Sequence, residues 1–286
     1  MRDVDPVAEI AAIEARARRV DTPCGDGTMA WRIWGEEHRD RPAVVLGHGA
    51  QGAWSHWIRN IEALSERFTV IAADLPGQGD SALPETPDHR GLSKAIAEGL
   101  RAIVGEGQSV DFVGFSFSGI AFAHCAAYYP DVARRLILIG CGGLDTPHGH
   151  IDLKRASGLQ GEERRAVLKS NLLGLMLHHP ETVDDLALHL LVANARLTRL
   201  VKADLVMPDR LKRILPEVRC PVDAIWGEFD RPHPDPAVQA AVIRSVQPET
   251  DFRVIAGAGH WAMYERPEAF NHELIDMLEA GPRPVI

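Results

Sequence analysis

The 286-residue chain lacks several features that mark common classes of protein. Its four cysteines form no C-x-x-C pair, which excludes the zinc and dithiol redox motifs built on that spacing. No apolar run reaches the length of a membrane span. Residues 1–19 are charged and contain no apolar stretch, so we expect no secretory signal. Basic residues cluster only briefly, at Arg16–Arg19, and the net charge is −9, which disfavours nucleic acid as a partner.

Together these absences predict a cytoplasmic protein with reduced thiols, which acts on a small molecule and binds neither nucleic acid nor a membrane. They leave open whether the chain forms a homo-oligomer. The composition, 45% hydrophobic and 25% charged, is typical of a soluble globular protein. The length suits one large domain or a core with a sizeable insertion. Cys125 and Cys141 lie in apolar runs, so we expect them to be small core residues.

Apolar runs alternate with helical patterns along most of the chain. Several runs are continuously apolar, as strands buried in a parallel sheet should be. The segment Val20–Trp34, with a Gly-Asp-Gly turn near its middle, predicts a β-hairpin, and Gly91–Val104 and Ile120–Tyr129 predict helices. The alternation predicts an α/β fold with a mostly parallel sheet flanked by helices. We expect strands at Met29–Trp34, Ala43–Gly47, Thr69–Ala73, Ser109–Val113, Leu136–Gly140, Val222–Trp226 and Phe252–Ile255.

The alternation stops between residues 142 and 216, where the sequence is helical, rich in Leu and His, and without a clear strand. It resumes at Arg219–Val222. A strandless stretch inside an alternating pattern predicts a helical insertion that covers the core. We therefore assign residues 1–141 and 217–286 to the core and residues 142–216 to a helical cap.

The stretch VGFSFSG follows one expected strand and leads into a helix, which is the context of a G-x-S-x-G nucleophile elbow. Gly114 stands two residues before Ser116, and Ser118, which is still small, takes the place of the second glycine. If Ser118 were the nucleophile, the bulky Ile120 would stand at the tight strand–helix contact. We therefore predict Ser116 as the nucleophile; an ordinary Ser/Gly-rich turn is the structural alternative.

A nucleophilic serine needs a base, and the base needs an acid that orients it. Asp230 follows the expected strand Val222–Trp226, and His260 follows Phe252–Ile255. Both therefore lie at the carboxyl ends of strands, where open α/β sheets build their sites. Each alone fits a capping aspartate or a loop histidine. The order Ser116, Asp230, His260, each after its own strand, predicts a catalytic triad.

Acyl transfer also needs two N–H groups aimed at the developing oxyanion. We predict the backbone amide of Phe117, just after the nucleophile, and that of Ala50, in the HGAQG loop after the strand Ala43–Gly47. The turn DLPGQGDS, from Asp74 to Ser81, lacks the spacing of a phosphate-binding loop, so we exclude nucleotide binding.

These motifs resemble the α/β-hydrolase superfamily: HGAQG, DLPGQGDS, GFSFSG, WGEFD and GAGHW occur in that family's order. The resemblance covers roughly residues 43–140 and 220–280, with the strandless stretch in the place of the family's helical cap. It implies the α/β-hydrolase fold. Ser116, where other branches carry Asp, argues against haloalkane dehalogenases and epoxide hydrolases.

The run GHWAMYERPEAFN and the stretch HGAQGAWSHW resemble the meta-cleavage-product hydrolases, which cut a C–C bond in vinylogous diketo acids, and the carboxylesterases near them. This resemblance implies a substrate pocket that includes Trp54, Trp57, Phe115 and Trp261. A cap arginine receives the substrate carboxylate in that branch. Arg196 and Arg199 lie in the predicted cap, and neither matches the motif.

The sequence thus predicts a serine hydrolase that acts on a carbonyl substrate, either a 2-hydroxy-6-oxodienoate-like compound or a small carboxylic ester. The alternatives are a ligand receptor that keeps the triad, and a lyase or cofactor-independent oxygenase on the same fold. No H-E-x-x-H or paired-carboxylate spacing accompanies the histidines of the cap, so we predict no metal and no cofactor.

Overall fold

The computed structural model describes residues 5–200 and 203–282 and contains an eight-stranded sheet, in the order β1-β2-β4-β3-β5-β6-β7-β8. Residues 1–4 and 283–286 of the predicted core and residues 201–202 of the predicted cap lie outside the described part. The strands are β1 (Arg18–Cys24), β2 (Gly27–Trp34), β3 (Val44–Gly47), β4 (Val70–Ala73), β5 (Val110–Phe115), β6 (Ala133–Ile139), β7 (Val222–Gly227) and β8 (Phe252–Ile255).

The predicted α/β fold class is confirmed, because the sheet is mostly parallel and flanked by helices. β1 and β2 form the expected hairpin, with Cys24 opposite Gly27, and β2 pairs antiparallel with β4. All other pairs are parallel. Each of the seven expected strands overlaps an observed one.

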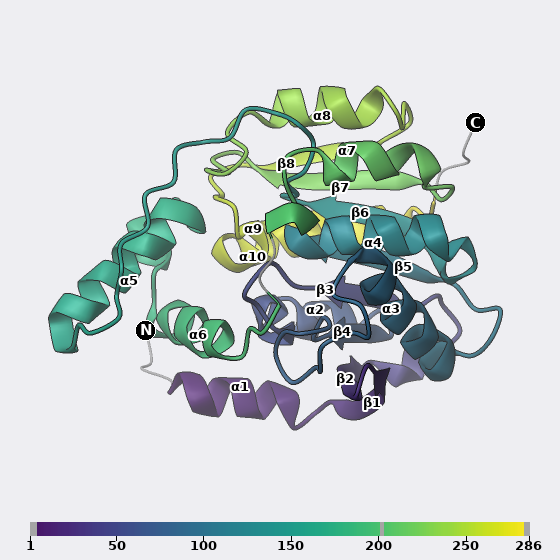
Figure 1. Cartoon of the computed structure of the whole chain (residues 1–286), viewed down its shortest axis with the longest axis horizontal. Coiled ribbons are helices and arrows are strands. Elements are labelled where there is room, and N and C mark those ends of the chain that lie inside the picture. The colour runs from purple at the N-terminus through teal and green to yellow at the C-terminus, as the bar shows by residue number, and fades with distance from the viewer. Residues whose placement is uncertain (1–4, 201–202, 283–286) are drawn as a thin grey trace.

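Helices cover both faces of the sheet (Figure 1). The helices are α1 (Pro6–Glu14), α2 (Ile61–Ser65), α3 (His89–Val104), α4 (Phe117–Tyr128), α5 (Gly161–Leu175), α6 (Asp185–Arg196), α7 (Arg210–Ile214), α8 (Pro236–Arg244), α9 (Ala262–Glu265) and α10 (Pro267–Glu279). Side chains alternate between the faces of a strand. Val45 belongs to the core cluster that includes residues of α3, α4, α7 and α8, whereas Val44 and Leu46 belong to the cluster that includes residues of α2 and α10. Cys125 and Cys141 are buried, as expected.

The strandless stretch between β6 and β7 has two parts. In Figure 1, α5 and α6 stand to one side of the sheet, whereas α7 lies against α4. Leu211 and Leu215 accordingly belong to the core cluster that includes α4. The carboxyl ends of β3, β5, β7 and β8 meet at the side of the sheet nearest α5 and α6 (Figure 1).

An N-terminal helix, α1, packs against α6. The Asp5 side chain accepts a hydrogen bond from the amide of Val7 and caps the helix, with Pro6 at its first position. The indole of Trp34 donates to the carbonyl of Ile13 at 3.0 Å, which fixes α1 against β2. Within the described ranges, none of the helices is both long and apolar enough to cross a membrane.

Candidate active site

The turn between β5 and α4 holds Ser116 in a backbone conformation that side chains rarely adopt, with φ 52° and ψ −111°. The Ser116 amide donates to the carbonyl of Ile139 on β6 at 2.8 Å, which anchors the turn to the neighbouring strand. A Cβ on Gly114 would lie 2.5 Å from the Cα of Gly119, so strand and helix touch through these two glycines. The local sequence thus enforces the sharp turn on which a nucleophile elbow depends.

Ser118 is fully buried, and its hydroxyl donates to the carbonyl of Phe115 at 3.0 Å. A Cβ on Gly47 would lie 2.5 Å from the Cβ of Ser118, so β3 contacts the helix at this point. Ser116, by contrast, is partly exposed. Of the two serines, only Ser116 is therefore accessible to a ligand.

Asp230 follows β7, His260 follows β8, and their side chains meet: His260 Nδ1 lies 2.9 Å from Asp230 Oδ2. Both are buried, with Asp230 at 0% and His260 at 5% exposure. Burial raises the pKa of Asp230, but the charge interaction with His260 and hydrogen bonds from His233 and His260 outweigh it and lower the pKa to about 2. The Asp230 carboxylate is thus ionised at neutral pH.

Three further contacts bring the strand ends together. The ring centroids of Phe115 and His260 lie 4.9 Å apart, which places His260 against the residue that precedes Ser116. A Cβ on Gly49 would lie 3.5 Å from the Cβ of Ser116. A Cβ on Gly140 would lie 2.9 Å from Asp230 Oδ2. The structure therefore gathers the three predicted triad residues and the loop after β3 at one edge of the sheet.

The loop after β3 is held by hydrogen bonds on both sides of Ala50. The Gly49 amide donates to His56 Nδ1 at 3.3 Å, and the Gly52 amide donates to Gln78 Oε1 at 3.3 Å. Within the described residues, neither the Ala50 amide nor the Phe117 amide donates a hydrogen bond to another group of the chain. That both bind a ligand oxygen stays a prediction.

Comparison with known proteins identifies the family of this chain. The model of the Alpha/beta hydrolase family matches residues 44–273. The chain belongs to this family. The 2-hydroxy-6-oxononadienedioate/2-hydroxy-6-oxononatrienedioate hydrolase of Paraburkholderia phymatum is 28% identical over 255 residues, which span 83% of this chain and 87% of the relative. The 2-hydroxy-6-oxo-6-phenylhexa-2,4-dienoate hydrolase of Burkholderia cepacia is 27% identical over 272 residues, which span 89% and 94%.

Solved structures agree on the fold of this α/β hydrolase. A carboxylesterase from Bacillus subtilis has a TM-score of 0.78 at 18% identity, with 96% of each chain covered. Naproxen esterase from the same organism has a TM-score of 0.75 at 16% identity, with 96% of this chain and 95% of that one covered. The resemblance inferred from the motifs is therefore confirmed.

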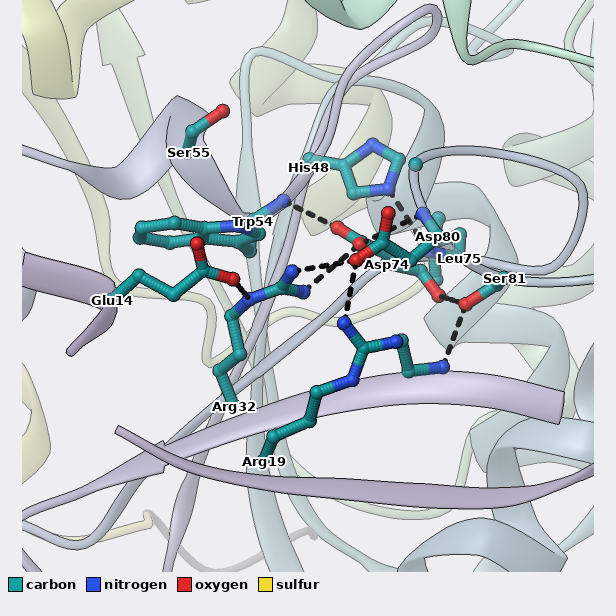
Figure 2. Close-up of polar contacts among 12 residues, drawn as sticks. Glu14, Arg19, Arg32, His48, Trp54, Ser55, Asp74, Leu75, Asp80 and Ser81 are labelled. Carbon is teal, nitrogen blue, oxygen red and sulfur yellow. Dashed lines mark hydrogen bonds and ion pairs between the residues drawn. The ribbon is translucent and has the colours of Figure 1, made fainter. Parts of the chain in front are cut away.

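A buried ion pair between Arg32 and Asp74 supports the loop after β3, as Figure 2 shows. Arg32 and Asp74 are 3% and 1% exposed, and Arg32 Nη1 lies 3.0 Å from Asp74 Oδ2. The other carboxylate oxygen of Asp74 accepts the amide of Trp54 at 2.8 Å, and the first oxygen accepts the amide of Asp80 at 3.1 Å. Glu14 and Asp80 bind the remaining guanidinium nitrogens of Arg32. The DLPGQGDS turn therefore serves as a scaffold for the loop.

All four aromatic residues predicted for the substrate pocket are buried in one core cluster, and two of them, Trp54 and Trp57, fix the loop after β3. Trp57 is 0% exposed, and its indole donates to the carbonyl of Gly47 at 2.9 Å. Trp54 is 4% exposed and packs on Trp34 and under the guanidinium of Arg32. Both rings hold the loop in position, and their part in a substrate pocket stays a prediction.

Phe115 and Trp261 are also buried, but they border the site. Phe115 packs on His260, and the indole of Trp261 donates to the carbonyl of His56 at 3.0 Å. The His56 ring lies 5.0 Å from Trp261 and 5.9 Å from Phe115. Burial lowers the pKa of His56 well below its usual value, so the ring is neutral and can accept the Gly49 amide. Sequence reasoning missed His56, which stands between the two tryptophans of AWSHW.

A cleft of about 860 Å³ opens between the cap helices and the loop after β3. Gln51, next to Ala50, lines it together with apolar side chains such as Met176 and Leu191, and with Arg196. Arg199 is engaged elsewhere: its guanidinium donates to the carbonyls of Gly79 and Ser81. Of the two arginines singled out in the cap, only Arg196 lines this cleft, and none of Ser116, Asp230 and His260 is among the lining residues.

Glu265, on α9, joins the cap to the loop that carries His260. Its buried carboxylate accepts the amides of His178 and His179 at 2.8 and 2.7 Å, and the amide of Gly259 at 2.6 Å. The Thr182 hydroxyl adds a bond at 3.0 Å. The cap turn at residues 177–182 and the histidine loop thus share one anchor, which sequence reasoning did not find.

Within the described residues, one cluster of side chains is compact enough to hold a metal ion: the possible ligand atoms of Asp230, His233 and His260 all lie within 4.8 Å of one another. Both rings already direct Nδ1 at the carboxylate, at 2.9 Å from His260 and 3.2 Å from His233. The three groups therefore form a closed hydrogen-bonded set rather than an open metal site.

Proposed function

We propose that the chain is a serine hydrolase in which Ser116 is the nucleophile, His260 the general base and Asp230 the acid that orients the base. The observation that carries the proposal is the 2.9 Å contact between His260 Nδ1 and Asp230 Oδ2, made beside the strained turn of Ser116. Because the carboxylate holds Nδ1–H, the other ring nitrogen, Nε2, is left to take a proton from the serine.

In the first half of the reaction, Ser116 Oγ attacks the substrate carbonyl carbon while its proton passes to His260 Nε2. The carbonyl oxygen becomes an oxyanion, and Asp230 stabilises the imidazolium. The oxyanion accepts hydrogen bonds from the amides of Ala50 and Phe117. The Gly49 amide is bonded to His56, whereas the Ala50 amide has no acceptor in the described chain, which favours Ala50 for this role.

Collapse of the tetrahedral adduct breaks the bond to the leaving group, which takes the proton from His260. With an ester the leaving group is an alcohol. With a C–C substrate, a prior shift to the keto form makes the leaving group a stabilised carbanion, which must be protonated on carbon. Water then attacks the acyl-enzyme with His260 as base, and Ser116 regains its proton.

For the substrate, we propose a 2-hydroxy-6-oxodienoate-like compound, with a small carboxylic ester as the second candidate. The relatives named as dienoate hydrolases support the first, and the esterase fold neighbours are consistent with the second. The cleft beside Gln51 is largely apolar, and we assign Arg196, which lines it, to the substrate carboxylate.

The decisive experiment compares turnover of p-nitrophenyl acetate with turnover of a 2-hydroxy-6-oxodienoate. We expect kcat/KM to be higher for the dienoate by at least about tenfold, since its carboxylate adds a charged contact; the reverse ratio would identify an esterase. Ser116→Ala and His260→Ala should each lower kcat by about three orders of magnitude or more, with little further loss in the double variant. Full activity in Ser116→Ala would overturn the triad.

Arg196→Gln tests the carboxylate contact separately. We expect KM to rise for the dienoate and to stay unchanged for the neutral ester, because only the first carries the charge that Arg196 would bind. Arg165→Gln is a matched control, since Arg165 lies on α5 and is already paired with Asp185. An equal effect of Arg196→Gln on both substrates would exclude the contact.

The main alternative is a ligand receptor that keeps the triad. Tight binding of a dienoate or an ester without turnover of either would favour it. A lyase or oxygenase would instead form products that contain no added water. Product analysis by mass spectrometry in H₂¹⁸O separates these from hydrolysis, which places ¹⁸O in the released acid.

A further inference from the structure

The Asp230 carboxylate has two oxygens, and His260 contacts only one of them. The other, Oδ1, accepts the backbone amide of His233 at 2.9 Å and faces the ring nitrogen Nδ1 of His233 at 3.2 Å. His233 is 4% exposed and its ring centroid lies 5.5 Å from that of His260. Two imidazole rings therefore flank one buried carboxylate, and only one of them belongs to the proposed triad.

The contact with Asp230 places a proton on one ring nitrogen of His233. An ionised carboxylate can only accept, so Nδ1 of His233 is the donor. Nε2 faces the position of Gly142, where a Cβ would lie 3.2 Å away, and the ring lies 5.2 Å from the exposed ring of His148. The side chain is thus a donor held between Asp230 and the segment that follows β6.

We propose that His233 is a positioning residue: it fixes the Asp230 carboxylate and limits the negative charge that this carboxylate offers to His260. This inference rests on the proposed triad mechanism. Each N–H donor on a carboxylate draws charge toward itself. With the ring of His233 in place, part of the charge of Asp230 is directed away from the imidazolium that forms during catalysis.

The proposal predicts the pH at which kcat/KM falls on the acid side. Removal of the His233 ring leaves more charge for His260, which favours the protonated and inactive form of His260. The rate should then fall at a higher pH than in the wild type. Among the described residues, the titratable groups that interact with His233 or His260 are Asp230, His148 and His56, and Cys141 lies near the Asp230 carboxylate.

The test is the pH dependence of kcat/KM in the wild type, His233→Ala, His233→Leu and His233→Asn, on whichever substrate the wild type turns over. We expect the acid limb of the first two variants to move up by about half a pH unit and kcat to fall about tenfold, as for loss of one hydrogen bond to a charged group. His233→Asn, which keeps a side-chain N–H, should restore most of both. An unchanged acid limb in a folded Ala or Leu variant would overturn the proposal.

A second measurement needs neither turnover nor a variant. The ¹⁵N shifts of the His233 ring in the wild-type protein report its tautomer, and we expect the proton on Nδ1. A proton on Nε2 would overturn the proposal, because that ring could not donate to Asp230. This readout survives even if Ser116→Ala proves the triad mechanism wrong. His148→Ala is the control for the kinetics: it removes the neighbouring ring without touching Asp230 and should leave the acid limb in place.

Discussion

The missing side chain of Gly114 faces the backbone of Gly119, and a Cβ at Gly114 would lie 2.5 Å from the Gly119 Cα and 2.6 Å from its amide nitrogen. Both neighbours are backbone atoms, which cannot turn aside. We therefore expect Gly114→Ala to push β5 and α4 apart at the elbow, with a loss of roughly 1–3 kcal/mol in stability, as for other overpacked sites. The urea midpoint of unfolding measures this loss, and activity should fall with it because the turn carries Ser116.

Gly174→Ala is the matched control. Gly174 lies within α5, where a Cβ would meet its nearest atoms at 3.6 and 3.8 Å, which is ordinary contact. Alanine is the better helix former, by about 0.8–1 kcal/mol in exposed helices. This variant should be as stable as the wild type or more so. Equal losses in both variants would mean that the elbow contact is not tight.

Replacement of Ser118 separates the two serines of the elbow. Ser118→Gly removes a hydroxyl that bonds only to the Phe115 carbonyl, and it restores the glycine common at this point of an elbow. We expect ester or dienoate turnover within a few fold of the wild type. Ser116→Gly should abolish it, since it removes the proposed nucleophile. Loss of activity in Ser118→Gly, with Ser116 intact and the protein folded, would contradict the assignment.

Glu265→Gln tests the anchor between cap and histidine loop. An amide has one acceptor oxygen, so at least one buried N–H group that now meets the carboxylate loses its partner, at about 1–3 kcal/mol. We expect a lower melting temperature and a lower kcat on p-nitrophenyl acetate, because the Gly259 amide precedes His260. Glu181→Gln, an exposed carboxylate in the same cap turn, should change neither quantity. An unaffected kcat in Glu265→Gln would show that the anchor serves stability alone.

The stacked histidines His89 and His124 predict a pH dependence of stability. Their rings lie 3.6 Å apart, and burial lowers the pKa of His89 to about 4 and that of His124 to about 3, against 6.5 when exposed. Below pH 6.5 the unfolded chain takes up protons that the native state refuses, so the free energy of unfolding falls as pH drops toward 4. Urea titrations at pH 7, 6 and 5 measure the slope.

His124→Phe should flatten that slope, because the unfolded chain then binds one proton fewer. His272→Gln, at an exposed position on α10, should leave the slope as it is. A slope unchanged in His124→Phe would refute the assignment to the stacked pair.

The sheet could be predicted from the sequence because strands buried in parallel pairs carry continuous apolar runs, as in Val44–Gly47 and Val70–Ala73. The signal for α1 is also present, since Asp5 and Pro6 form a capped helix start. The packing of α1 on Trp34 and α6 could not be predicted from the sequence, because these partners are remote in sequence.

The candidate site also has parts that the sequence predicts and parts that it does not. The pairing of Asp230 with His260 could be predicted from chain order, since each follows a parallel strand and such strand ends converge. The roles of Glu265 and His233 could not, because each is defined by hydrogen bonds that only the folded chain provides. The burial of Trp54 could not be predicted either, because the sequence does not distinguish an aromatic ring that lines a site from one that packs beneath it.

Because the Glu265 carboxylate binds both the cap turn and the histidine loop, the two segments depend on each other structurally. A cap exchanged with that of another family member would have to bring backbone amides to the positions of His178 and His179, or the recipient would lose the fixed start of its histidine loop. Substitutions in this turn change groups that share the Glu265 carboxylate with Gly259, the residue before His260. New specificity should therefore arise more easily on α5 and α6, away from residues 177–182.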